Sequence, residues 1–117
     1  MKVSDIVDKF NLEVFSGKSG LGREVKGGYV SDLLSDVMGH SKEGQLWITL
    51  QTHKNVMAIA SLKDLAAVIL VKDFKPNEDT VKQSDLEGVP ILGTRENTFE
   101  ITGKIFQYLK ENEIIQG

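Results

Sequence analysis

The stretch QLWITLQTHKNVMAIASLKDLAAVILVKD, residues 45–73, indicates the fold class because two apolar strands flank one helix in it. Residues 45–51 and 66–73 are rich in β-forming, apolar side chains almost throughout, which is typical of strands covered on both faces. Residues 52–64 between them have the pattern of a largely buried helix that begins at Thr52. This order predicts parallel strands joined by a right-handed crossover.

The same alternation continues to the end of the chain. Residues 77–88 predict a polar helix closed by Gly88, and residues 89–94 a third buried strand. The last helix, 97–114, is predicted to start at an Asn97 cap with a capping box. Before residue 45 the pattern is less regular, with helices expected at 4–10 and 31–40 and extended segments at 12–15 and 23–30. We expect a single α/β domain covering residues 1–117.

Composition excludes several classes of protein. The 117 residues are 40% apolar and 26% charged, as in globular proteins, and the net charge of -3 is opposite to that of most nucleic-acid-binding proteins. The longest apolar run, 65–71, is too short to cross a bilayer, and charges occupy the place of a signal-peptide core. Without cysteine there is neither a disulfide nor a thiolate zinc site. A cytoplasmic protein without nucleic-acid or membrane partners is therefore expected.

Polar side chains follow each predicted parallel strand, and ligands bind at such strand ends in open α/β sheets. The residues that follow the four strands are, in turn, Ser31 and Asp32; Gln51, Thr52, His53 and Asn55; Lys72 and Asp73; and Thr94 and Arg95. If these strands are neighbours, their loops form one polar crevice that suits an anionic or nucleotide-like ligand. The alternative is structural, because Thr52 and Asn97 are ordinary helix caps and Lys54 and Arg95 are ordinary surface cations.

A metal site and a catalytic site are not expected. Asp32, Asp36 and His40 are spaced one helical turn apart, but the two aspartates lie opposite the apolar face of their helix. With two histidines and no cysteine, three or four convergent metal ligands are hard to assemble. The sequence SGKSG at 16–20 resembles the end of a P-loop, yet Leu12 stands where that motif needs glycine. Acid–base chemistry by His53 with Asp32 is the remaining enzymatic alternative.

Three stretches of the sequence form a recognisable set: GLGREVKGGYVSDLLSDVM (20–38), the G-x-x-W-I-T strand (44–49) followed by QTH, and AAVIL (66–70) leading to VPIL (89–92). Together they resemble the DRTGG domain, most closely its stand-alone form in anaerobic bacteria. The naming motif itself is absent, and LGREVKGG (21–28) is the nearest stretch. The resemblance implies a three-layer α/β/α sandwich with a small, mostly parallel mixed sheet, similar to the N-terminal domains of HPr kinase/phosphorylase and some Mur ligases.

The resemblance also implies a regulatory or assembly role, since the kinase chemistry of HPr kinase lies in a separate P-loop domain, and it assigns no catalytic residue or cofactor. We therefore favour a non-enzymatic, ligand-sensing module. A homodimer is expected by analogy, because sheet edges need protection. The alternative is a scaffold for a separately encoded enzyme, whose mark would be an exposed apolar patch. Leu21, Tyr29, Ile114 and Ile115 are the candidates for that patch.

Overall fold

The computed structural model of the chain describes residues 1–116 and contains one five-stranded sheet in the order β1-β5-β4-β3-β2. The strands are β1 (Glu13–Ser16), β2 (Gly27–Val30), β3 (Gln45–Thr49), β4 (Ala67–Leu70) and β5 (Ile91–Gly93). Strands β2 to β5 are parallel, and β1 pairs antiparallel with β5. The expected α/β fold with a mostly parallel, mixed sheet is confirmed.

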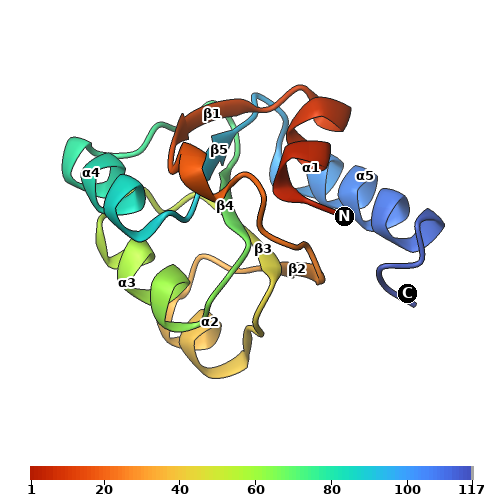
Figure 1. Ribbon diagram of the computed structural model, residues 1–117, viewed down its shortest axis with the longest axis horizontal. Coiled ribbons are helices and arrows are strands. Elements are labelled where there is room, and N and C mark those ends of the chain that lie inside the picture. Colours follow the sequence, from red (N-terminus) through yellow and green to blue (C-terminus); the bar gives the residue numbers. More distant parts are fainter. Residues whose placement is uncertain (117) are drawn as a thin grey trace.

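Helices cover both faces of this sheet. They are α1 (Val3–Phe10), α2 (Leu34–His40), α3 (Asn55–Leu62), α4 (Glu78–Glu87) and α5 (Thr98–Glu111), with a short 3-10 turn η1 (Lys18–Gly20). Because β2 to β5 follow one another across the sheet, right-handed crossovers place α2, α3 and α4 on the same face. Helices α1 and α5 lie together on the other face, which completes the three layers (Figure 1).

The side chains of the central strands alternate between two apolar cores. Leu46 and Ile48 of β3 pack toward α1 and α5, whereas Trp47 between them packs toward α2 and α3. All three are buried, as are Val68 and Ile69 on the neighbouring strand β4. Strands buried on both faces explain the continuous apolar runs of the sequence. Among residues 1–116, no helix is long and apolar enough to cross a membrane.

Two helices begin two residues later than the sequence pattern predicts, with Leu33 rather than Ser31 and Lys54 rather than Thr52 at the N-cap position. Helix α2 starts at Leu34 rather than after Ser31, because the Ser31 hydroxyl accepts the Leu33 N–H and stabilises a turn before the helix. Helix α3 starts at Asn55, and the Thr52 carbonyl instead accepts hydrogen bonds from the loop and first turn of α4. The α5 cap is as predicted, with Asn97 Oδ1 accepting the Glu100 N–H at 2.9 Å.

Truncating Ile69 tests the two-sided burial of the central strand. Ile69 is fully buried on β4, so Ile69→Ala should lower the free energy of unfolding by about 2–5 kcal/mol. Leu62→Ala is the control, because Leu62 is 71% exposed and its removal should change stability by only about 0.5 kcal/mol. Urea unfolding followed by the fluorescence of Trp47, the single tryptophan, measures both. Equal losses in the two variants would contradict the assignment of the core.

Candidate functional site

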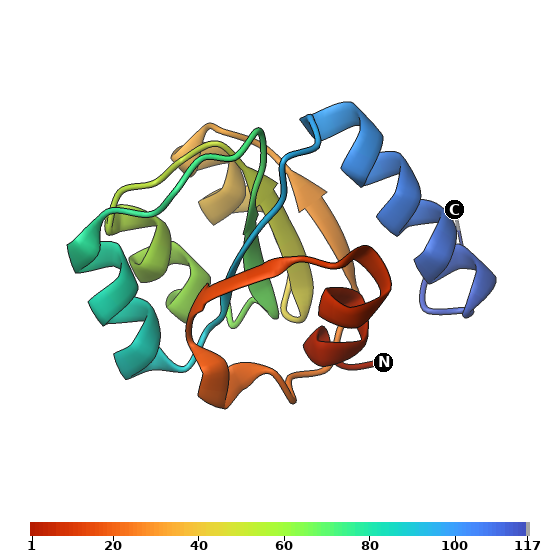
Figure 2. The same ribbon diagram turned by 90° about the horizontal axis from the view of Figure 1, so that it is seen from above.

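A hollow lies where the loops after β4 and β5 diverge. The chain leaving β4 turns to α4 on one face of the sheet, and the chain leaving β5 turns to α5 on the opposite face (Figure 2). Such a switch point is where open α/β sheets bind ligands. The hollow has a volume of 670 Å³, within the range of small-molecule sites. It is lined by Asn11, Glu13, Phe15, Asp73, Phe74, Lys75, Gly93, Thr94 and Arg95, and we call it the β4/β5 pocket.

An irregularity in β1 places an aromatic ring in this pocket. The register of β1 against β5 shifts between Val14 and Ser16, so Phe15 occupies a bulge. Bulges redirect side chains, and here the Phe15 ring lies across Gly93. A Cβ atom at Gly93 would stand only 2.4 Å from Phe15 Cε2, which makes glycine necessary for this ring position. The bulge and the glycine thus act together.

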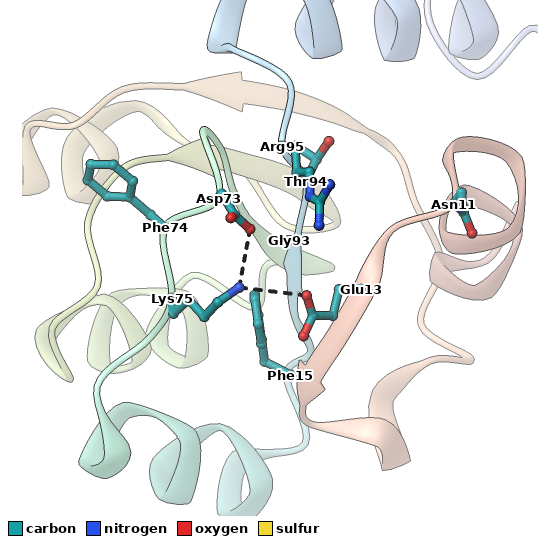
Figure 3. A pocket seen from close by; sticks show the side chains of 9 residues that line it. All are labelled: Asn11, Glu13, Phe15, Asp73, Phe74, Lys75, Gly93, Thr94 and Arg95. Atoms are coloured by element: carbon teal, nitrogen blue, oxygen red, sulfur yellow. Dashed lines mark hydrogen bonds and ion pairs between the residues drawn. The ribbon is translucent and has the colours of Figure 1, made fainter.

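The pocket carries balanced charge. The Lys75 amine lies between two carboxylates, 3.2 Å from Asp73 Oδ1 and 3.9 Å from Glu13 Oε1 (Figure 3). The same amine stands 5.3 Å from the centre of the Phe15 ring, a cation–π contact. Arg95 adds a second cation, and it has no ion pair within residues 1–116. An entering anion would therefore meet one cation that no other side chain neutralises.

Strained backbone holds one wall of the pocket. Lys72 and Asp73 both have positive φ, 56° and 61°, a conformation that costs non-glycine residues about 1–2 kcal/mol each. Their N–H groups donate to the carbonyls of Glu96 and Thr94, both at 2.9 Å, so the loop after β4 is bonded to the loop after β5. Strain of this kind persists only where neighbouring structure enforces it and is concentrated at functional sites.

Of the residues expected at this edge, Asp73, Thr94 and Arg95 line this pocket, and Lys72 precedes Asp73 in the loop after β4. The others lie further along the same edge, beyond β3 and β2. Three strand spacings, about 14 Å, separate β2 from β5. The residues at the carboxyl ends of the strands therefore lie along a line across the sheet and do not surround a single crevice.

Ser31, Asp32 and Gln51 form a closely bonded group at the far end of this line. Asp32 Oδ1 accepts hydrogen bonds from the Thr49 hydroxyl and the Leu50 N–H, both at 2.8 Å. The Gln51 amide donates to the Asp32 carbonyl, and the Trp47 indole N–H donates to the Ser31 carbonyl. These bonds connect the β2 and β3 loops, so Asp32 Oδ1 and the Gln51 amide N–H already have protein partners.

Thr52, His53 and Asn55 form a middle group beside the start of α4. His53 Nδ1 lies 3.2 Å from the Asn77 side-chain amide, and the Thr52 carbonyl accepts the Thr80 hydroxyl at 2.8 Å. Asn55 is exposed as the first residue of α3. Within residues 1–116, His53 and Asp32 share no hydrogen bond, and their bonds go to different partners.

The Asp36 carboxylate is engaged by a tyrosine. The Tyr29 hydroxyl donates to Asp36 Oδ2 at 2.9 Å. This bond, with smaller contributions from Ser31 and the charge of His40, holds the pKa of Asp36 below its ordinary value, while the same contact raises the pKa of Tyr29. Within the part of the chain that the structure describes, no three His, Cys, Asp or Glu side chains gather closely enough to hold a metal ion.

The pocket residues that the sequence did not reveal come from two places. Asn11 follows α1, and Glu13 and Phe15 belong to β1, whose pairing with β5 leaves no mark in sequence periodicity. Phe74 and Lys75 follow the strand-end residues Lys72 and Asp73, and the cluster FKP could have been included with them. The sequence does not show that β1 pairs antiparallel with β5, and this pairing brings Glu13 and Phe15 to the pocket.

Fold and pocket define a small α/β domain with a ligand-sized hollow at the carboxyl ends of its parallel strands. The chain belongs to the DRTGG domain family, which matches residues 5–108. The resemblance seen in the sequence is thereby confirmed.

Two relatives show how far this likeness extends. HPr kinase/phosphorylase of Bacillus licheniformis is 26% identical over 125 residues, covering 94% of this chain and 40% of that protein. The fold is also similar to a crystal structure of the CBS and DRTGG domains of the regulatory region of Clostridium perfringens pyrophosphatase, complexed with its activator diadenosine tetraphosphate. That match has a TM-score of 0.68 and 13% identity, and it covers 91% of this chain and 46% of the other. The chain thus spans less than half of each relative.

Adding a methyl group at Gly93 tests how Phe15 is placed. Gly93→Ala should force the Phe15 ring away and lower the free energy of unfolding by about 1–3 kcal/mol. Gly28→Ala is the matched control, because a Cβ atom at this other strand glycine meets nothing nearer than Leu46 O at 3.7 Å. Chemical denaturation compares the two variants. A Gly93→Ala protein as stable as the control would show that Phe15 does not need this position.

The bond between Tyr29 and Asp36 predicts a pH-dependent loss of stability. Because the folded pKa of Asp36 is depressed, its stabilising effect is full above the ordinary aspartate pKa of about 3.9 and disappears as pH falls through the lower folded pKa. Tyr29→Phe should therefore be less stable than the unmodified protein at pH 6, with the difference shrinking below about pH 3.9. Urea unfolding from pH 3 to pH 6 measures it, and a difference independent of pH would contradict this assignment.

Proposed function

We propose that residues 1–117 act as a single DRTGG-like regulatory domain, without catalysis of its own, that binds a small anionic, nucleotide-like ligand in the β4/β5 pocket. The observation that carries this proposal is that Arg95 lines the same pocket as Lys75 and the Phe15 ring, at the switch point of the sheet. Cations bind phosphate oxygens and aromatic rings stack on planar bases, so the pocket offers both halves of a nucleotide a partner.

The two cations would play different parts. Arg95 is exposed and has no ion pair among residues 1–116, so it can approach a phosphate with its paired N–H donors. Lys75 is shared by Asp73 and Glu13, which neutralise it while the pocket is empty. A phosphate near Lys75 would compete with these carboxylates and loosen the contact between the β4 loop and β1. Binding would thereby be coupled to a change in the loop, which a regulatory domain requires.

The Clostridium perfringens pyrophosphatase structure supports testing adenine nucleotides first, because that regulatory region was solved with diadenosine tetraphosphate. We also propose that the chain acts in pairs and conveys ligand binding to a separately encoded enzyme. The second candidate, a scaffold without a ligand, draws support from exposed apolar side chains such as Phe106 and Phe99.

Two features support the absence of catalysis. The SGKSG segment is occupied by the protein itself, because the Gly17 N–H donates to Asp85 at 2.7 Å and η1 packs against the Gly88 and Val89 carbonyls. A phosphate-binding loop needs such N–H groups free. The Asp32 carboxylate accepts two hydrogen bonds from the β3 end rather than contacting His53. The acid–base alternative is therefore less well supported than ligand binding.

Binding of ADP to Arg95 variants tests this proposal. Arg95→Ala should weaken binding by about 10- to 100-fold, the effect of losing a charged hydrogen bond of about 1.5–3 kcal/mol. Lys42→Ala is the matched control, because Lys42 is an exposed cation just before β3. It therefore lies at the amino ends of the parallel strands, and the pocket lies at their carboxyl ends. Titration calorimetry with ADP, diadenosine tetraphosphate and inorganic phosphate gives the affinities, and circular dichroism checks that both variants fold.

Two results would contradict the proposal. If Arg95→Ala and Lys42→Ala weaken binding equally, surface cations attract the anionic ligand without specificity, and the β4/β5 pocket is not the binding site. If none of the three probes binds at millimolar concentration, the nucleotide class is wrong and the scaffold alternative gains support.

A further inference from the structure

A second hollow lies away from the β4/β5 pocket, between the edge strand β2 and helix α5. It has a volume of 410 Å³ and, unlike the first pocket, a mostly apolar lining that includes Gly28, Val30, Ile48, Ile105 and Leu109. Figure 2 shows α5 running beside β2 on the α1 side of the sheet. We call this hollow the β2/α5 groove. None of the residues proposed to bind a ligand lines it.

The groove exists because β2 lacks a side chain where its neighbour has one. Gly28 pairs with Leu46 of β3, so it faces the α5 layer as Leu46 does. The Leu46 side chain is buried in the core, whereas Gly28 has no side chain and is exposed, so the space beside it on this face is empty. A Cβ atom there would meet only Leu46 O at 3.7 Å, so the fold itself does not require glycine at this position. The space beside Gly28 is therefore open to an incoming side chain.

A protruding side chain stands at the rim of this groove. Phe106 on α5 is 47% exposed, and Phe99, seven residues earlier on the same helix face, is 88% exposed. Val30 at the end of β2 is 45% exposed. Leu21, Tyr29, Ile114 and Ile115, the residues expected from sequence to form a patch, are instead half-buried. Phe106, Phe99 and Val30 thus place exposed apolar side chains on the face that α5 and β2 share.

Both a cavity and a projecting aromatic ring occur on this one face, which makes the face complementary to itself. A two-fold axis beside β2 would bring the groove of one copy opposite Phe106 of the other, as isologous dimers require. Strand β2 is also an edge of the sheet, and edge strands commonly pair with a second chain. A two-fold arrangement makes the two β2 strands antiparallel, so the sheets could adjoin.

The charges around the groove also favour a second copy. The charged side chains lining the groove and the two adjoining hollows along α5 are Lys26, Lys110, Glu111 and Glu113. Two positive and two negative charges cancel, although the chain as a whole carries -3. Two identical copies repel least where their surfaces are locally neutral.

We infer that a second copy of this chain docks on the β2/α5 groove, with Phe106 of each copy entering the groove of the other. This inference deepens the proposed pairing of two copies by assigning the surface they use.

Mass measurements on groove variants test the inference. The unmodified chain should have the mass of two chains at submillimolar concentration in light scattering, with a monomer appearing on dilution in sedimentation. Phe106→Glu places a charge in each groove, and Gly28→Val fills part of the cavity from a position where a Cβ atom meets only Leu46 O at 3.7 Å. Each should weaken association by at least about 10-fold. Leu86→Glu is the matched control, because Leu86 is 80% exposed on α4 in the opposite layer, and it should leave the mass unchanged.

Circular dichroism and melting temperature show whether each variant folds, and Gly28→Val provides the test if Phe106→Glu does not fold. A monomeric unmodified chain at submillimolar concentration would overturn the inference. So would dimers that persist in both groove variants, because another surface would then be in use. The measurement needs no ligand, so a monomer that still binds ADP would refute the pairing alone, and a dimer that binds no ADP would refute only the ligand proposal.

Discussion

The antiparallel pairing of β1 with β5 is the constraint on which the rest of this structure depends. Strands β2, β3, β4 and β5 are parallel and follow one another across the sheet in sequence order. Each right-handed crossover between them therefore places its helix on the same face. Because β1 already occupies the place beyond β5, the chain cannot add another strand there and passes to the opposite face as α5. The divergence of α4 and α5 opens the β4/β5 pocket. The return of α5 across the sheet toward β2 creates the β2/α5 groove.

The pocket combines features that a purely stable fold would avoid. Phe15 occupies a bulge, Gly93 gives up its side chain to accommodate the ring, and Lys72 and Asp73 adopt positive φ. These departures surround one hollow and are held by hydrogen bonds between the loops after β4 and β5. By contrast, Asp32 after β2 and Gln51 after β3 are hydrogen-bonded to each other and to the end of β3. Positive φ at Lys72 and Asp73 and an arginine, Arg95, that has no ion pair among residues 1–116 thus occur together at this pocket, which favours a binding site over a well-capped sheet edge.

Sequence patterns predict the parallel half of the fold because burial on both faces leaves continuous apolar runs at β3 and β4. The apolar run at residues 89–93 likewise predicts that Thr94 and Arg95 follow the end of a buried strand. Sequence patterns cannot reveal that β1 lies beside β5, since strand order depends on contacts between distant residues such as Glu13 and Gly93. Periodicity also misplaces the starts of α2 and α3, where Ser31 and Thr52 form turns and loop contacts instead of caps. The sequence therefore does not predict which of the strand-end residues lie close together in the folded chain.

The most direct test of the ligand site is an NMR titration of the 15N-labelled protein with ADP. Binding in the β4/β5 pocket should shift the backbone amides of Asp73, Phe74, Thr94 and Arg95 in a saturable manner, because these line the pocket or its loops. The amides of Ser31 and Asp32, three strands away, should stay in place. Shifts centred on Ser31 and Asp32 or on the β2/α5 groove, or no shifts at millimolar ADP, would contradict a nucleotide-like ligand at the switch point of the sheet.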